Sequence, residues 1–164
     1  MSRWPITREG YARLREELER LKKKDRVKVI REIQEARSHG DISENAEYHA
    51  AREKQGWIEA KIRDIETKLA DSEIVDPPRG PQERVQFGVR VRLENLETGE
   101  EEVYELVGPH ESDVSLGRIA ISTPLARAML GKEVGDEVIV KAPGRTREYE
   151  ILEIVGLTPT GNEG

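Results

Sequence analysis

Three carboxylates fall within seven residues in the stretch SHGDISENAEYHAA, which runs from Ser38 to Ala51. They belong to Asp41, Glu44 and Glu47. Carboxylates offer hard oxygen atoms, which suit Mg²⁺, an ion usually held by one or two carboxylates together with phosphates and waters. Two carboxylates on an exposed turn bind this ion only weakly by themselves. The spacing therefore indicates a half-site of Asp41 and Glu44, completed by another molecule.

The same residues have a simpler interpretation as a helix cap. Asp-x-x-Glu resembles a capping box, in which Asp41 is the N-cap and Glu44 reaches back to the backbone. Ser43 is an equally good N-cap. The two interpretations are compatible, because a capped turn can hold carboxylates in the geometry that a metal needs. The spacing alone leaves both of them open.

This stretch interrupts a long helical pattern. Thr7 is the expected N-cap of the first helix, and Gly40 is its expected end. Apolar residues follow Thr7 at helical spacing, and the pattern then slips in register, because Asp25 and Lys28 are poor core residues. The expected seam of this helix is Tyr11, Leu14, Leu18, Leu21, Ile30, Ile33 and Arg37.

The second helix carries apolar residues at heptad spacing for three heptads. Its expected seam is Tyr48, Ala51, Gln55, Ile58, Ile62, Ile65 and Leu69. Folding the chain back at residues 40–43 then pairs apolar residues at three levels, namely Leu14 with Leu69, Leu18 with Ile65, and Leu21 with Ile62. The pattern predicts an antiparallel coiled-coil hairpin over residues 1–76. Its acidic tip, residues 40–47, lies at the end of a rod about 45 Å long.

The second half of the chain has a different period. Residues 77–84 are rich in Pro and Gly, and we expect a linker there. Residues 85–157 contain five stretches typical of strands, VRVRLENL, EVYELVG, GRIAIST, DEVIVKAP and REYEILEIVGL. Pro124 opens a short predicted helix, and residues 158–164 are expected to be a disordered tail. The predicted fold class is α+β, a helical hairpin followed by a small antiparallel β domain.

Charge is unevenly distributed along the chain. Residues 1–76 hold 17 basic and 17 acidic side chains, whereas residues 77–164 hold 10 basic and 16 acidic ones and account for the whole net charge of −6. Within the neutral half, Arg20–Arg31 has seven basic residues and one acidic residue. This segregation fits a partner with differently charged zones, and a solvated helix face is the open alternative.

Several kinds of site are not supported by the sequence. The chain has no cysteine, so it has neither a disulfide nor a thiolate metal site. His39, His49 and His110 do not have the spacing of metal ligands. No apolar run approaches the roughly 18 residues of a membrane span, and we expect a cytoplasmic protein without a membrane partner. The second half is acidic and poor in aromatic residues, which favours docking on a protein over binding nucleic acid.

Two long stretches resemble a known family. ARSHGDISENAEYHAAREKQGWIEAKIRDIETKLADSEIVDP is similar to the tip and second helix of the bacterial GreA transcript cleavage factors, and STPLARAMLGKEVGDEV is similar to their C-terminal domain. The similarity runs from Pro5 to Leu157. Gre factors bind backtracked RNA polymerase, with an FKBP-like C-terminal domain on the rim of its secondary channel and the coiled coil inside. The resemblance implies an accessory factor, not an enzyme by itself, that stimulates the polymerase to cleave the nascent RNA near its 3′ end.

The resemblance also implies roles for particular residues, and we expect the chain to act as a monomer. Asp41 and Glu44 match the catalytic tip acids, which help to hold a Mg²⁺ shared with the polymerase. The expected supporting residues are Ser43, Asn45 and Tyr48 at the tip, Arg37 and Arg52 toward the RNA or the channel, and Ser122 and Pro124 for polymerase docking. Two alternatives stay open, a channel plug without cleavage activity and a structural coiled-coil protein.

Overall fold

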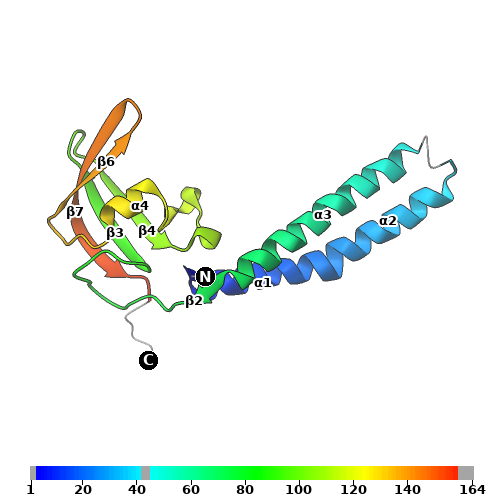
Figure 1. The fold of residues 1–164 in the computed structure, drawn as a ribbon, viewed down its shortest axis with the longest axis horizontal. Coiled ribbons are helices and arrows are strands. Elements are labelled where there is room, and N and C mark those ends of the chain that lie inside the picture. Colours follow the sequence, from blue (N-terminus) through cyan, green and yellow to red (C-terminus); the bar gives the residue numbers. More distant parts are fainter. Residues whose placement is uncertain (1–2, 42–44, 159–164) are drawn as a thin grey trace. The chain divides into compact units, whose positions relative to one another are not determined.

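The computed structural model contains all 164 residues and describes residues 3–41 and 45–158. The chain forms two compact units (Figure 1). One unit, Tyr11–Asp71, is a helical hairpin, and the other combines Met1–Gly10 with Ser72–Gly164 around a β-sheet. The α+β class predicted from the sequence is confirmed.

Two arms form the hairpin. The first arm consists of α1 (Arg8–Arg20), a π-helical turn η1 (Leu21–Asp25) and α2 (Arg26–Ser38), and the second arm is α3 (Ala46–Ala70). Thr7 caps α1 as predicted, since its hydroxyl oxygen accepts a hydrogen bond from the Gly10 amide at 3.0 Å. Gly40 follows the end of α2 with φ +123°, a backbone conformation that favours glycine.

A single apolar seam holds the two arms together. Its fully buried members are Leu21, Val29, Ile58, Ile62 and Ile65, and its half-buried members are Leu14, Leu18 and Leu69. All three predicted apolar pairs therefore contribute to one cluster. The prediction for the middle of the first arm was wrong, because Val29 is completely buried whereas Ile30 is 40% exposed. The wide π-helical turn rotates the chain less per residue than an α-helix does, and this turn brings Val29 onto the seam.

Ion pairs reinforce the seam along its edges. The Arg26 guanidinium donates to both carboxylate oxygens of Glu59, at 2.7 and 2.8 Å, and each partner is about one-third exposed. The other ion pairs between the arms are Lys22–Glu66, Lys61–Glu17 and Lys54–Glu32. Surface pairs of this kind contribute little individually, but together they fix the alignment of one arm against the other.

The sheet has the strand order β5-β4-β3-β7-β6. Its strands are β3 (Val89–Asn95), β4 (Glu101–Val107), β5 (Arg118–Ala120), β6 (Glu137–Ala142) and β7 (Arg145–Gly156). All neighbours are antiparallel except β4 and β5, which are parallel, so the prediction of a purely antiparallel sheet was wrong. Two short 3-10 turns, η3 (Pro109–Glu111) and η4 (Val114–Leu116), carry the chain back between β4 and β5.

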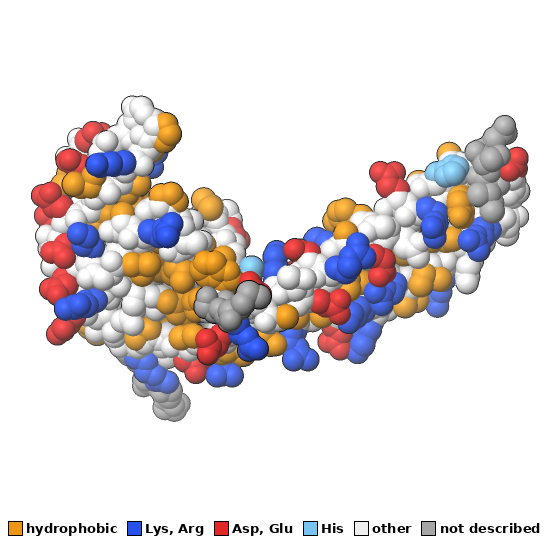
Figure 2. Space-filling view, viewed as in Figure 1, with side chains coloured by type: hydrophobic (Ala, Val, Ile, Leu, Met, Phe, Trp, Pro, Cys, Tyr) orange, Lys and Arg blue, Asp and Glu red, His pale blue; other side chains and the backbone are white. Residues whose placement is uncertain are grey.

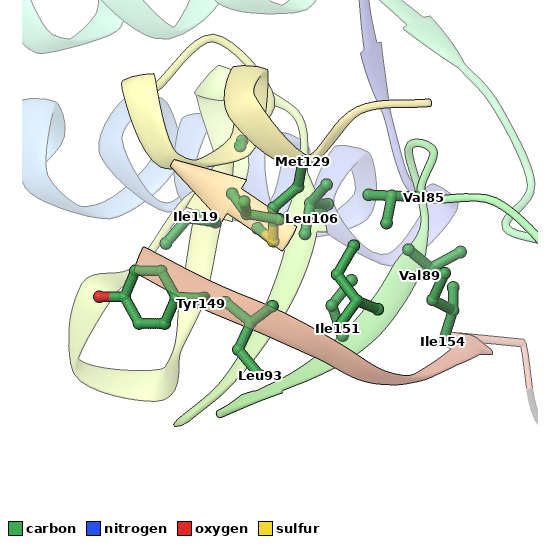
Figure 3. Packing of buried hydrophobic residues seen from close by; sticks show 12 residues of the cluster. Val85, Val89, Leu93, Leu106, Ile119, Met129, Tyr149, Ile151 and Ile154 are labelled. Atoms are coloured by element: carbon green, nitrogen blue, oxygen red, sulfur yellow. The ribbon is translucent and has the colours of Figure 1, made fainter. Parts of the chain in front are cut away.

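The core of this unit lies between the sheet and α4 (Pro124–Met129), as Figure 3 shows. Buried side chains alternate along β3 at Val89, Val91 and Leu93, which is the pattern that the sequence predicts. Met129 of α4 and Tyr149 of β7 are also buried in this cluster. The expected linker is packed against the end of β7, because the Gln82 amide donates to the Ile154 carbonyl and the Gly156 amide donates to the Gly80 carbonyl.

The first residues of the chain belong to the β-sheet unit, which the sequence analysis missed. β1 (Trp4–Ile6) pairs in parallel with β2 (Ser72–Ile74). The Glu111 carboxylate accepts hydrogen bonds from the Thr7 amide at 2.9 Å, from the Gly108 amide at 3.0 Å and from the Thr7 hydroxyl. A Cβ at Gly108 would lie only 1.9 Å from the Pro5 carbonyl oxygen, so this close approach requires glycine.

We expect Glu59→Gln to destabilise the hairpin in a pH-dependent way. The hydrogen bonds from Arg26 lower the pKa of the Glu59 carboxyl. Its contribution to stability is therefore present above the unfolded pKa, near 4.5, and is lost as the pH falls through the lower folded pKa. Chemical denaturation should show a loss of about 0.5–1 kcal/mol at neutral pH that vanishes in acid. The exposed residue Glu53 supplies the control Glu53→Gln, and an equal loss in both variants contradicts the prediction.

We expect Glu111→Ala to destabilise the β-sheet unit, since it leaves three donors on Thr7 and Gly108 without their acceptor. The free energy of unfolding should fall by about 2–3 kcal/mol, and hydrogen exchange at both amides should accelerate. Glu111→Gln should cost less, because an amide oxygen still accepts. The exposed Glu148 gives the control Glu148→Ala. Unchanged exchange at Thr7 and Gly108 in Glu111→Ala would show that the carboxylate does not anchor this segment.

Candidate functional site

The candidate site lies at the turn between α2 and α3. On the α2 side, His39 is the C-cap and Asp41 is exposed. On the α3 side, Asn45 immediately precedes the helix. Ser43 and Glu44, for which the sequence predicted a supporting and a metal-binding role, lie outside the described residues. The structure therefore defines both ends of the turn and one of its two predicted catalytic carboxylates.

Asn45 is the N-cap of α3. Its side-chain oxygen accepts a hydrogen bond from the Tyr48 amide at 3.0 Å, in the geometry that satisfies one of the open donors of a helix start. The capping box proposed for Asp41 is wrong for this helix, because α3 begins at Ala46 and Asn45 occupies the capping position. The presence of an acid at Asp41 is therefore not explained by capping of α3.

Asn45 also ties the two arms together. Its side-chain amide donates to the Ala36 carbonyl oxygen in the last part of α2. The Asn45 side chain thus caps α3 through its oxygen and binds the end of α2 through its nitrogen. The predicted supporting role of Asn45 in shaping the turn agrees with these contacts, although its part in a reaction stays a prediction.

Two further contacts cross the turn. The Arg37 guanidinium lies 5.8 Å from the centre of the Tyr48 ring, within range of a cation–π interaction. His39 Nδ1 lies 3.1 Å from a carboxylate oxygen of Glu47, at hydrogen-bond distance. The pairing of His39 with Glu47 was not predicted from the sequence. A C-cap residue facing the first turn of the next helix in a tight hairpin is the signal that would have indicated it.

The contacts of the turn leave an open hollow beside Asp41. It is lined by His39, Asp41, Asn45, Ala46 and Glu47. Its carboxylate and amide oxygens are of the kind that Mg²⁺ prefers. Among residues 3–41 and 45–158, however, no group of three or more acidic or histidine side chains could hold a metal ion. The half-site of Asp41 and Glu44 stays a prediction, because Glu44 lies outside the described residues.

The remaining predicted residues lie apart from this cluster. Arg52 is exposed on α3 and donates to the Gln55 side chain at 3.1 Å. Ser122 and Pro124 are exposed in the β-sheet unit, where Pro124 is the first residue of α4 and Thr123 caps that helix. Both are accessible on the surface, and their predicted role in docking is compatible with this exposure.

Comparison with known proteins identifies the class of protein. Residues 4–74 match the family model described as "Transcription elongation factor, N-terminal", and residues 80–155 match "Transcription elongation factor, GreA/GreB, C-term". A GreA of Thermodesulfovibrio yellowstonii is 51% identical over 93% of this chain and 96% of its own length. A GreA of Caulobacter vibrioides is 52% identical over 94% of this chain and 98% of its own length.

Solved structures include GreA factor homolog 1 of Thermus thermophilus, which is 29% identical and covers 94% of this chain and 99% of its own, with a TM-score of 0.43. The matches to both family models define a transcription elongation factor. The chain belongs to the GreA/GreB family, and its curated relatives place it with the GreA type. Within the described residues, no helix is both long enough and apolar enough to cross a membrane.

We expect two substitutions at Asn45 to separate its two structural roles. Asn45→Asp keeps the oxygen that caps α3 but loses the donor to Ala36, whereas Asn45→Ala loses both. Asn45→Ala should lower the free energy of unfolding by about 1–2 kcal/mol, and Asn45→Asp by less. Thermal unfolding followed by circular dichroism measures both. Equal stability of Asn45→Ala and the unaltered chain contradicts the assignment of Asn45 as the residue that closes the turn.

Proposed function

We propose that this chain enters the secondary channel of bacterial RNA polymerase and stimulates the polymerase to cleave backtracked nascent RNA. The observation that carries the proposal is the construction of the turn, in which Asn45 caps α3 while Asp41 is exposed at the end of the hairpin. The membership in a family of elongation factors supports RNA polymerase as the partner. We place this action in the cytoplasm, with the chain acting as a monomeric accessory factor and not as an enzyme by itself.

In this proposal, Asp41 and Glu44 supply carboxylate oxygens to a Mg²⁺ shared with the polymerase. Such an ion supplies an activated water and stabilises negative charge on the leaving oxygen of the phosphodiester. The described part of the turn supplies the Asp41 carboxylate, and in this proposal the ion binds only where the polymerase and the RNA provide the remaining ligands. Hydrolysis is thereby restricted to the assembled complex.

The other residues of the turn have positioning roles in this proposal. Asn45 fixes the start of α3 against the end of α2, so that Asp41 is presented from a closed turn. Tyr48 is held by the guanidinium of Arg37, and a cation in this place also attracts the phosphates of an RNA 3′ segment. Arg52 offers a second cation on α3, while Ser122 and Pro124 belong to the surface that docks on the polymerase.

We expect the double substitution Asp41→Asn and Glu44→Gln to reduce stimulated cleavage in backtracked complexes by at least about a hundredfold, because it removes two charged metal ligands. Affinity for the polymerase should stay nearly unchanged. The matched control is Glu16→Gln with Glu53→Gln, which neutralises two exposed acids of the hairpin away from the turn.

RNA shortening and polymerase binding are measured over a range of Mg²⁺ concentrations. Undiminished cleavage in the Asp41 and Glu44 variant would falsify the proposed roles of these acids. An unaltered chain that binds polymerase but never shortens the RNA would instead identify a channel plug.

A further inference from the structure

The first arm of the hairpin carries a row of cations that are not used by the seam. Arg20, Lys24, Lys28 and Arg31 are all exposed, at spacings of four, four and three residues. We call these four residues the basic face. Figure 2 shows Lys and Arg side chains along the hairpin, with acidic side chains among them.

The members of the basic face differ from their basic neighbours in their contacts. Lys22 pairs with Glu66 at 3.0 Å, Lys23 with Glu19 at 2.6 Å, and Arg26 with Glu59 at 2.7 Å. By contrast, none of the four members forms an ion pair within the part of the chain that the structure describes. Some cations of the first arm therefore form ion pairs within the hairpin. The four cations of the basic face are exposed and can contact another molecule.

The π-helical turn η1 aligns this row. In a regular α-helix, Arg20 and Lys28 would point about 80° apart, because each residue turns the chain by about 100°. The wider turn over Leu21–Asp25 reduces this angle and brings Arg20, Lys24 and Lys28 toward one line. Arg31 adjoins Lys28, since residues three apart are neighbours on a helix surface. The same irregularity that places Val29 on the seam thus gathers the cations on an outer face.

The basic face is short and bounded. Eleven residue steps at 1.5 Å per residue give it a length of about 16 Å. Exposed acids follow at both ends, with Glu16 four residues before Arg20 and Glu35 four residues after Arg31. Beside the row, Val27 is 43% exposed and is a helix neighbour of both Lys24 and Arg31. No aromatic residue occurs in this segment.

These features favour a protein partner over a nucleic acid. A phosphate chain prefers a continuous basic track with aromatic rings for stacking, and the acids at both ends would repel it. A folded acidic surface, in contrast, is limited in extent, and an exposed apolar side chain beside the charges suits a protein interface. We propose that the basic face docks on an acidic protein surface of RNA polymerase. This inference rests on the proposed function, which supplies the polymerase as the partner.

The test compares two charge reversals of equal size. Lys24→Glu with Lys28→Glu reverses the centre of the basic face. Arg15→Glu with Arg63→Glu reverses two exposed cations that lie outside it and form no ion pair in the described ranges, 3–41 and 45–158. The dissociation constant for core RNA polymerase is measured at low and at high salt, and circular dichroism verifies that both variants keep their helices.

We expect the reversal at Lys24 and Lys28 to weaken binding at least about tenfold at low salt and by less at high salt, because exposed charges are screened. The reversal at Arg15 and Arg63 should change the dissociation constant by less than about threefold. Unchanged affinity in the first variant overturns the inference. Equal weakening of both variants also overturns it, since net charge alone then explains the effect.

Two further measurements separate the alternatives. If the reversal at Lys24 and Lys28 abolishes binding of short single-stranded RNA while polymerase affinity is retained, the basic face serves nucleic acid and the inference is overturned. The RNA cleavage that the unaltered chain stimulates is measured in backtracked RNA polymerase complexes. Its absence contradicts the proposed cleavage function, whereas the affinity comparison between the two reversals alone decides the role of the basic face.

Discussion

The helical hairpin depends on the burial of one narrow apolar seam. The large aliphatic residues of this seam, such as Leu21 and Ile62, lie along the middle and the base of the arms. Toward the turn, the buried side chains of the described residues are Ile33 and the small Ala36 and Ala51, and the two alanines remove little surface from water. Hydrogen bonds must therefore close the turn where apolar packing no longer does. The dual contacts of Asn45 meet this need, and Asp41 is exposed beside them.

Much of the candidate site was predictable because its signals are local. The position of the turn follows from Gly40 and from the heptads that begin after it, and the acids at 41 and 44 are visible in the sequence itself. The identity of the cap was not predictable in this way, because Asp41, Ser43 and Asn45 are all good capping residues. Only the start of α3 at Ala46 distinguishes them. The contact of His39 with Glu47 likewise requires the two arms to be placed in space.

The fold shows the same division between local and long-range information. The five strands of the sheet and the helix at Pro124 follow from alternation and from capping, which involve neighbouring residues. The parallel pairing of β4 with β5 and of β1 with β2 depends on where distant segments meet, and strand patterns do not encode this. The misplaced seam at Ile30 has a third cause, since heptad counting assumes a regular helix and η1 departs from one.

The anchoring of the N-terminal segment bears on the order in which the chain folds. The hydrogen bond from the Thr7 amide to Glu111 spans 104 residues, and β1 has to wait for β2 before it can pair. Ribosomes add about 5–20 residues per second, so these first residues are without their partners for several seconds after they are made. The hairpin, by contrast, needs only Tyr11–Asp71 and can form before Glu111 is synthesised. The segment that holds β1 and Thr7 is thus among the last described parts of the chain to reach its final place.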